Sequence, residues 1–233
     1  MLPVAILAGG LATRLRPITE KIPKALVEVA GKPFLFHQLD WLQRQKVERV
    51  VLCVGYLGDM IRERVGNGEH WKIDVRYSFD GEKLLGTGGA LKKALPLLGG
   101  EFFVFYGDSF LPIDFLPVQE AFRASGRPAL MTFLRNQGRW DRSNVEARGG
   151  QLITYNKRVP TPAMEHIDYG LGVLAERVFE EWKASRSFDL ADLYHALAQK
   201  GDLAGHEVVH RFYEIGSKEG LIETERFLRS ETT

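Results

Sequence analysis

Short apolar runs alternate with helical stripes along the first half of the chain. Runs rich in β-branched or aromatic residues predict four β-strands, at Val4–Leu7, Arg49–Val54, Lys72–Tyr77 and Phe102–Tyr106. Apolar residues at helical spacing between these runs predict α-helices at Pro33–Gln45, Tyr56–Val65 and Gly88–Leu95. Since parallel neighbouring strands need a crossover connection, this alternation predicts right-handed βαβ units and a largely parallel sheet covered on both faces.

The pattern changes from Ala129 onward. Strands are expected at Ala129–Leu134, Asn144–Ala147, Leu152–Tyr155 and Asp168–Leu174, with a short one near Glu207–Val209. Helices are expected at Ala175–Lys183, Asp189–Gln199 and Lys218–Leu228. No linker-like segment, low-complexity tract or internal repeat separates the halves. We therefore expect one domain over residues 1–233, in which 129–233 places a mixed-sheet subdomain over a cleft in 1–128.

Composition narrows the class of partner. The chain has 233 residues, 45% of them hydrophobic and 26% charged, with a formal net charge of +1. This balance argues against nucleic acid or an anionic membrane, because both demand a basic excess. No apolar run approaches the ~20 residues that span a bilayer, and we expect a cytoplasmic protein. The single cysteine, Cys53, lies in the run Val50–Val54 and is expected to be a buried structural thiol.

A glycine-rich loop follows the first predicted strand. It contains Leu7, Ala8, Gly9, Gly10, Thr13 and Arg14, and Pro23-Lys24 comes shortly after. Two adjacent glycines let backbone N–H groups approach phosphate oxygens, and the end of a strand in an α/β sheet is where ligands bind. Arg14 is expected to grip phosphates, and Lys24 to bring a compact charge near the reacting phosphorus. The spacing fits neither the dinucleotide fingerprint nor the P-loop.

Two further segments add candidate ligand contacts. Asp108 ends the buried strand Phe102–Tyr106 after one glycine, a place suited to a metal or ligand, although capping the turn with Ser109 would also explain it. The segment Gly86-Thr87-Gly88-Gly89 precedes a predicted helix, and a flat base could lie against it. A glycine-rich helix start is the plain alternative there.

The loop and the Pro-Lys pair together resemble the signature of the sugar-1-phosphate nucleotidyltransferases, which read L-A-G-G-x-G-T-R-L-x-P-x-T and then P-K. Ala12 departs from this pattern by replacing the last glycine. The resemblance covers essentially the whole chain. The nearest subgroup is the D-glycero-D-manno-heptose 1-phosphate guanylyltransferases, and the segments Asn136–Asn144 and Phe188–Tyr194 carry that closer resemblance. It implies a Rossmann-like three-layer α/β fold of the GT-A-like kind, with a mostly parallel mixed central sheet.

The resemblance also implies roles for residues. Asp108 would bind Mg²⁺ together with a second carboxylate, Glu214, which stands where the family has aspartate. Gly86, Thr87, Gly88 and Gly89 would line the base and ribose, making 1–128 a nucleotide-binding half. In the sugar-binding half, 129–233, the sugar phosphate would contact the residues Asn144, Glu146, Lys157, Asp168 and Gly170. Exposure on a strand surface is the alternative for each of these polar residues, and the turn just before the predicted helix Lys218–Leu228 is the alternative for Glu214.

These features predict transfer of a nucleotidyl group from a nucleoside triphosphate to a sugar 1-phosphate, with release of pyrophosphate. GTP and a heptose or mannose phosphate are the first expectation, and CTP, UTP, dTTP, glucose and N-acetylmuramate stay open. Two other functions also stay open: that of a non-catalytic nucleotide-binding relative, and transfer to a cofactor or polyol phosphate as acceptor. The oligomeric state is open as well, and a homo-oligomer is one option.

One motif matches a known pattern by chance. His206-Glu207-Val208-Val209-His210 matches the zinc-protease pattern, but its Val-Val centre and aromatic flank predict a strand. Residues four apart on a strand are ~13 Å apart, too far for one zinc ion. We therefore expect no zinc site here.

Overall fold

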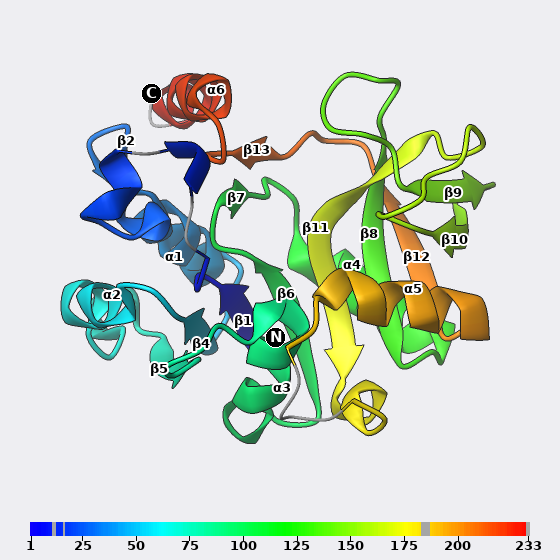
Figure 1. The fold of residues 1–233 in the computed structure, drawn as a ribbon, viewed down its shortest axis with the longest axis horizontal. Helices are drawn as coiled ribbons and strands as arrows, with labels where there is room; N and C mark the ends of the chain where they lie inside the picture. The colour runs from blue at the N-terminus through cyan, green and yellow to red at the C-terminus, as the bar shows by residue number, and fades with distance from the viewer. Residues whose placement is uncertain (11–12, 16, 183–186, 232–233) are drawn as a thin grey trace.

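The computed structural model describes residues 1–10, 13–15, 17–182 and 187–231. Its centre is a nine-stranded sheet (Figure 1). Four parallel strands form the first half in the order β6 (Glu101–Tyr106), β1 (Val4–Leu7), β4 (Arg49–Val54), β5 (Asp74–Phe79). Their shared direction brings the carboxyl ends of all four to one edge of the sheet, which is the edge where α/β folds bind ligands.

The second half extends the same sheet beyond β6. Strand β11 (His166–Ala175) runs antiparallel to both β6 and β8 (Ala129–Arg135), and β12 (Leu203–Val208) pairs parallel with β8. The hairpin β9 (Val145–Arg148) and β10 (Gln151–Tyr155) joins at the start of β11. The sheet is thus mixed, and it continues without interruption across residue 128.

Helices cover both faces of this sheet. Along β1, Val4 and Ile6 belong to one apolar cluster and Ala5 to the other, as the two-residue period of a strand requires. The first face is packed by α1 (Phe34–Arg44), α2 (Gly58–Val65) and α4 (Phe115–Ser125), and the second by α3 (Gly86–Leu98) and α5 (Leu190–Lys200). In Figure 1, α3 and α5 lie in front of the sheet. The expected three-layer α/β fold is confirmed.

The C-terminal segment returns to the first half. Strand β13 (Tyr213–Glu214) pairs with β7 (Ser109–Phe110), and α6 (Lys218–Ser230) follows it. A small cluster that includes Phe34, Phe110, Ile215 and Leu228 seats α6 near the hairpin of β2 (Glu28–Val29) and β3 (Lys32–Pro33), as Figure 1 shows at its upper left. Residues from both ends of the sequence therefore surround the Asp108 segment.

The structure corrects two expectations. A helix was expected at Ala175–Lys183, but β11 runs to Ala175 and only a short 3₁₀ helix, η5 (Glu176–Phe179), follows; Lys183 lies outside the described residues. Helix α4 was not predicted, and its Pro117 is tolerated because the first turn needs no intrahelical N–H. The other predicted elements are confirmed, with ends displaced by a few residues. None of the described helices is long and apolar enough to span a bilayer.

Candidate active site

The loop after β1 is packed against the neighbouring strands. The Ala8 N–H donates to the Cys53 carbonyl at 2.8 Å, and the Gly107 N–H donates to the Leu7 carbonyl at 2.9 Å. A Cβ added at Gly9 would lie 3.1 Å from the Gly55 nitrogen, whereas one at Gly10 would meet nothing within 4 Å. Gly9 thus allows close approach of two backbones, and the space beside Gly10 is open to a ligand. Leu11, Ala12 and Arg16 lie outside the described residues, and so does the departure at Ala12.

A cavity of about 410 Å³ opens beside this loop. Leu7, Ala8, Gly9, Gly10, Gly86 and Thr87, all predicted to bind nucleotide, line it together with Arg14, Lys24 and Asp108. Arg14 is exposed on η1 (Thr13–Leu15), whose Leu15 is buried and anchors the turn. The structure therefore brings together a phosphate-type loop, two cations and a carboxylate that are up to a hundred residues apart in sequence.

A second cavity, of about 650 Å³, lies over β11 in the second half. Four residues predicted to contact the sugar phosphate line it, namely Asn144, Lys157, Asp168 and Gly170. Glu214 also lines it. Arg14, Tyr106 and Asp108 border both cavities, so the two spaces meet at these three residues.

Lys24 and Asp108 form an ion pair at this junction. Lys24 Nζ donates to Asp108 Oδ2 at 2.7 Å, and the lysine side chain is only 15% exposed. Lys24 begins the 3₁₀ helix η3 (Lys24–Leu26), in which Ala25 is buried, and Pro23 precedes it in an extended conformation. The pair places a positive and a negative group where the two cavities meet.

Glu214 is brought next to Asp108 by strand pairing. Glu214 lies opposite Ser109 in the β13–β7 ladder, and the Ile215 N–H donates to the Asp108 carbonyl at 2.9 Å. Its carboxylate accepts hydrogen bonds from the Gly216 N–H and, at 3.0 Å, from Ser217 Oγ, the N-cap of α6. Glu214 thus also has the position before a helix that was its alternative explanation.

The donor set at the junction fits a hard divalent cation. Asp108 and Glu214 supply carboxylate oxygens, each with lone pairs left beyond the hydrogen bonds above. Among the described residues no group of three or more His, Cys, Asp or Glu side chains forms an all-protein metal cage. Mg²⁺ is commonly bound by one or two carboxylates, and water or phosphate oxygens complete its coordination.

Asp168 lies in the wall of the second cavity. Its backbone N–H donates to Asn144 Oδ1 at 2.8 Å, and its Oδ1 accepts the Gly170 N–H at 2.9 Å. Burial raises the pKa of the Asp168 carboxyl to about 6, and the Gly170 N–H and the Lys157 ammonium oppose that rise. Asp168 and Lys157 therefore present a half-buried carboxylate and a cation to the same space.

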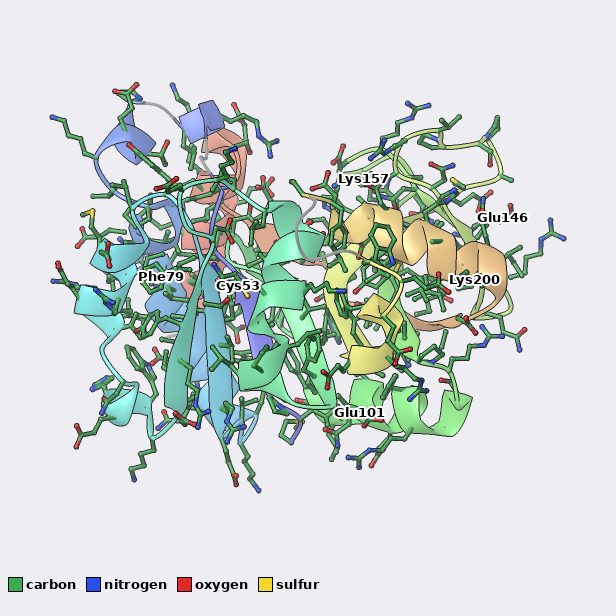
Figure 2. All side chains as sticks on the ribbon, turned by 60° about the horizontal axis from the view of Figure 1, so that its bottom comes forward. Cys53, Phe79, Glu101, Glu146, Lys157 and Lys200 are labelled. Atoms are coloured by element: carbon green, nitrogen blue, oxygen red, sulfur yellow. The ribbon has the colours of Figure 1, made fainter. Side chains whose placement is uncertain are left out.

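Glu146 lies apart from this group. It pairs with Arg148 at 2.9 Å and is not among the residues that line either cavity. In Figure 2 it lies at the outer edge of the second half, whereas Lys157 lies on the side toward the first half. The turn that carries Lys157 is shaped by Asn156, whose Oδ1 accepts the N–H groups of Arg158 and Val159.

Two glycines in the first turn of α3, Gly88 and Gly89, serve the packing of the chain. The N–H groups of Gly88 and Gly89 donate to the Phe188 carbonyl at 3.0 and 3.2 Å, and a Cβ at Gly88 would clash with the Phe188 ring. Neither residue lines the cavity. Thr87 does line it, but its Oγ1 accepts the Leu190 N–H at 2.7 Å at the start of α5.

Several cavity residues were not predicted from the sequence. Asp80 and Asp189 line the first cavity, and burial raises the pKa of Asp80, opposed by the Leu85 N–H. Asp80 directly follows β5, just as Asp108 follows β6 after one residue, so the same rule of a carboxylate past a strand end could have found it. Cys53 also borders this cavity and is labelled in Figure 2; it is buried, as predicted, and burial raises its thiol pKa to about 12, which disfavours the nucleophilic thiolate.

The segment that matches the zinc-protease pattern is not helical. Its first three residues, from His206 to Val208, belong to β12, in agreement with the predicted strand.

Comparison with known proteins decides the family. The sequence profile described as Nucleotidyl transferase matches residues 4–142, which is more than half of the chain. The chain belongs to this family. Members of the family generally use a divalent metal ion. The matched residues include the glycine-rich loop, Arg14, Lys24 and Asp108.

Relatives of this family member extend the match to the second half. The D-glycero-alpha-D-manno-heptose 1-phosphate guanylyltransferase of Aneurinibacillus thermoaerophilus is 31% identical over 185 residues, covering 78% of this chain and 79% of that protein. The mannose-1-phosphate guanylyltransferase catalytic subunit beta of Xenopus tropicalis is 28% identical over 223 residues, covering 93% of this chain. The chain spans only 62% of the length of that subunit.

A solved structure supports the fold independently. A putative glucose-1-phosphate thymidylyltransferase from Bacillus anthracis superimposes with a TM-score of 0.86 at 21% identity, covering 98% of this chain and 96% of that one. At this level of identity the likeness speaks for the nucleotidyltransferase fold.

Proposed function

We propose that this protein transfers a nucleotidyl group from a nucleoside triphosphate to a sugar 1-phosphate, forming a nucleotide-sugar and pyrophosphate. The observation that carries the proposal is the meeting of two cavities at Arg14, Tyr106 and Asp108. A triphosphate in the first cavity and a sugar phosphate in the second would present their phosphates to each other at this junction.

The reaction needs no general base. The nucleophile is an oxygen of the sugar phosphate, and a phosphate monoester with a second pKa of ~6 is mostly ionised near neutrality. This oxygen forms a bond to the α-phosphorus, the bond from that phosphorus to the bridging oxygen breaks, and pyrophosphate leaves with the electron pair. The barrier lies in bringing two anions together and stabilising the charge of the leaving group.

The side chains at the junction suit that task. Arg14 can grip the triphosphate in a bidentate manner, and Lys24 can neutralise charge at the reacting phosphorus. Lys157 supplies the cation for the acceptor phosphate, while Asn144, Asp168 and Gly170 border the space for the sugar. We further propose Mg²⁺ as the metal, held by Asp108 and Glu214; when bound, it would offset the negative charge of the phosphates.

The choice of substrates is proposed as GTP with a heptose or mannose 1-phosphate. The names of the two relatives above support it, since both are guanylyltransferases that act on such phosphates. The nucleotide cavity offers a carboxylate, Asp80, whose oxygens can accept hydrogen bonds from guanine, which carries an N2 amino donor. We also propose that the protein is cytoplasmic and forms a homo-oligomer.

A substrate panel tests the proposed function. GTP, CTP, UTP and dTTP are each combined with mannose, heptose, glucose and N-acetylmuramate 1-phosphates in the presence of Mg²⁺, and pyrophosphate is measured. We expect release that requires both substrates, fastest with GTP and a heptose or mannose phosphate. Binding of a triphosphate without turnover for any pair would identify a non-catalytic relative, and turnover with a polyol phosphate alone would identify a different acceptor.

A further inference from the structure

One polar side chain interrupts the apolar face of α1. The side chains that this helix turns to the sheet include Leu35, Leu39 and Leu42, and Gln38 lies beside them with only 2% of its surface exposed. Burying an amide costs free energy unless its groups are hydrogen-bonded. Gln38 is therefore expected to serve a specific set of hydrogen bonds.

Those hydrogen bonds bracket the metal-type carboxylate. Gln38 Nε2 donates to the Tyr106 carbonyl at 3.1 Å and to the Ser109 carbonyl at 2.7 Å. The two carbonyls stand on either side of Gly107-Asp108, where the chain leaves β6 and turns into β7. One nitrogen thus fixes both ends of the turn that carries Asp108.

The chemistry selects glutamine at this position. A side-chain amide NH₂ group offers two hydrogen-bond donors without carrying a charge. Since carbonyl oxygens accept hydrogen bonds and do not donate them, the NH₂ side of the Gln38 amide must face the two carbonyls. Gln38 Oε1, by contrast, is buried and has no hydrogen-bond partner among the described residues. An unpaired buried acceptor destabilises the folded protein, and an apolar residue in this face would avoid that cost.

Other contacts hold the same turn from different sides. The Gly107 N–H is tied to the end of β1 through the Leu7 carbonyl, and the Asp108 carbonyl is tied to β13 through the Ile215 N–H. A side chain at Gly107 would be crowded, because its Cβ would lie 3.1 Å from both the Leu7 carbonyl oxygen and the Ala8 Cβ. Gln38 supplies the remaining restraint, from the face of the sheet that α1 covers.

We propose that Gln38 is a positioning residue that sets the Asp108 carboxylate for divalent metal and phosphate. This inference rests on the proposed function for its meaning, but it concerns a residue that touches neither cavity. Groups that orient metal ligands from outside typically change metal affinity or activity by about 10–100-fold when they are replaced.

The test compares Gln38→Met with a matched control, Gln119→Met. Gln119 is also buried, on α4 at the same face of the sheet, and its Oε1 accepts the Leu2 N–H at 2.8 Å, away from the turn that carries Asp108. Both substitutions keep the side-chain length and remove a buried amide. Mn²⁺ binding is measured by electron paramagnetic resonance, for the metal alone and with the triphosphate that the substrate panel selects, without acceptor; unfolding temperature is measured in parallel.

We expect Gln38→Met to weaken Mn²⁺ binding at least tenfold and to raise the metal concentration needed for half-maximal turnover by a similar factor, with excess metal restoring part of the rate. Gln119→Met should lose stability only. Gln38→Asn, which is too short to reach both carbonyls, provides a milder variant should the methionine variant fail to fold, and it should show the same direction.

Unchanged Mn²⁺ affinity in a folded Gln38 variant would overturn the inference, as would equal losses in the Gln38 and Gln119 variants. Turnover of the native protein tests the proposed function, whereas Mn²⁺ affinity tests the role of Gln38. A native protein that binds Mn²⁺ in a Gln38-dependent manner but turns over no substrate pair would refute the transferase assignment while leaving the positioning role in place.

Discussion

At the scale of single residues, the site depends on groups of opposite charge that are held close together before any substrate binds. Lys24 and Asp108 form a partly buried ion pair, and Arg14 stands exposed beside them. Both partners line the first cavity, where the lysine can turn to a phosphate and the carboxylate to a metal ion. The positive charges of Lys24 and Arg14 are therefore in place before the phosphates bind, and electrostatic catalysis requires such preorganisation.

Arg14→Ala is expected to reduce turnover by about 10²–10³-fold, judged by comparable electrostatic donors. The unfolding temperature should stay near that of the native protein, because Arg14 is exposed while its neighbour Leu15 provides the packing. Steady-state kinetics and thermal unfolding measure the two effects. Arg123→Ala, which removes an exposed cation from α4, is the control and should keep native turnover; equal rates in both variants would remove Arg14 from the reaction.

Asp168 predicts a pH-dependent stability. Its carboxyl pKa is raised to about 6 in the folded protein, whereas an unfolded aspartic acid titrates near ~3.9. The folded protein thus binds this proton more tightly, and the stabilisation that protonation brings is lost as pH rises from about 4 to about 6. Asp168→Asn keeps an oxygen for the Gly170 N–H, so it should unfold at a higher temperature than the native protein at pH 8. The difference should shrink at pH 4, and a difference independent of pH would contradict this origin.

At the scale of elements, the sequence predicted most of the strands and helices but not the contacts between distant segments. The period of apolar residues located β1, β4, β5 and β6, and the rule that ligands bind past strand ends located Gly9, Gly10 and Asp108. The packing of Phe188 against Gly88 could not be predicted, since it depends on how α3 and the start of α5 meet. Gln38 was missed for the same reason, because its two acceptors lie about seventy residues away.

The contact between α3 and the Phe188 segment yields a prediction of its own. Gly88→Ala would push a methyl group into the Phe188 ring, and overpacking of this kind typically costs about 1–3 kcal/mol of unfolding free energy. Gly100→Ala is the matched control, because an added Cβ there meets nothing within 4 Å. Urea unfolding should show a lower midpoint for Gly88→Ala alone. Similar midpoints for both variants would mean that the Phe188 segment yields at little cost.

At the scale of the whole molecule, one continuous sheet supports both cavities. The first lies past the ends of the parallel strands and the second over β11, which runs antiparallel beside β6. The return of β13 and α6 to the first half closes the site around Asp108 with residues from the end of the chain. The family resemblance implied two halves with separate substrates, whereas the border that Arg14, Tyr106 and Asp108 share is seen only in the folded molecule.

The rate of pyrophosphate release by the native protein and by Asp108→Ala, with and without the sugar phosphate, tests this account most directly. We predict release by the native protein only when triphosphate, sugar 1-phosphate and a divalent metal are all present. Asp108→Ala should fold and be at least ~10²-fold slower. Near-native release by Asp108→Ala, or release by the native protein that does not depend on the sugar phosphate, would contradict the account.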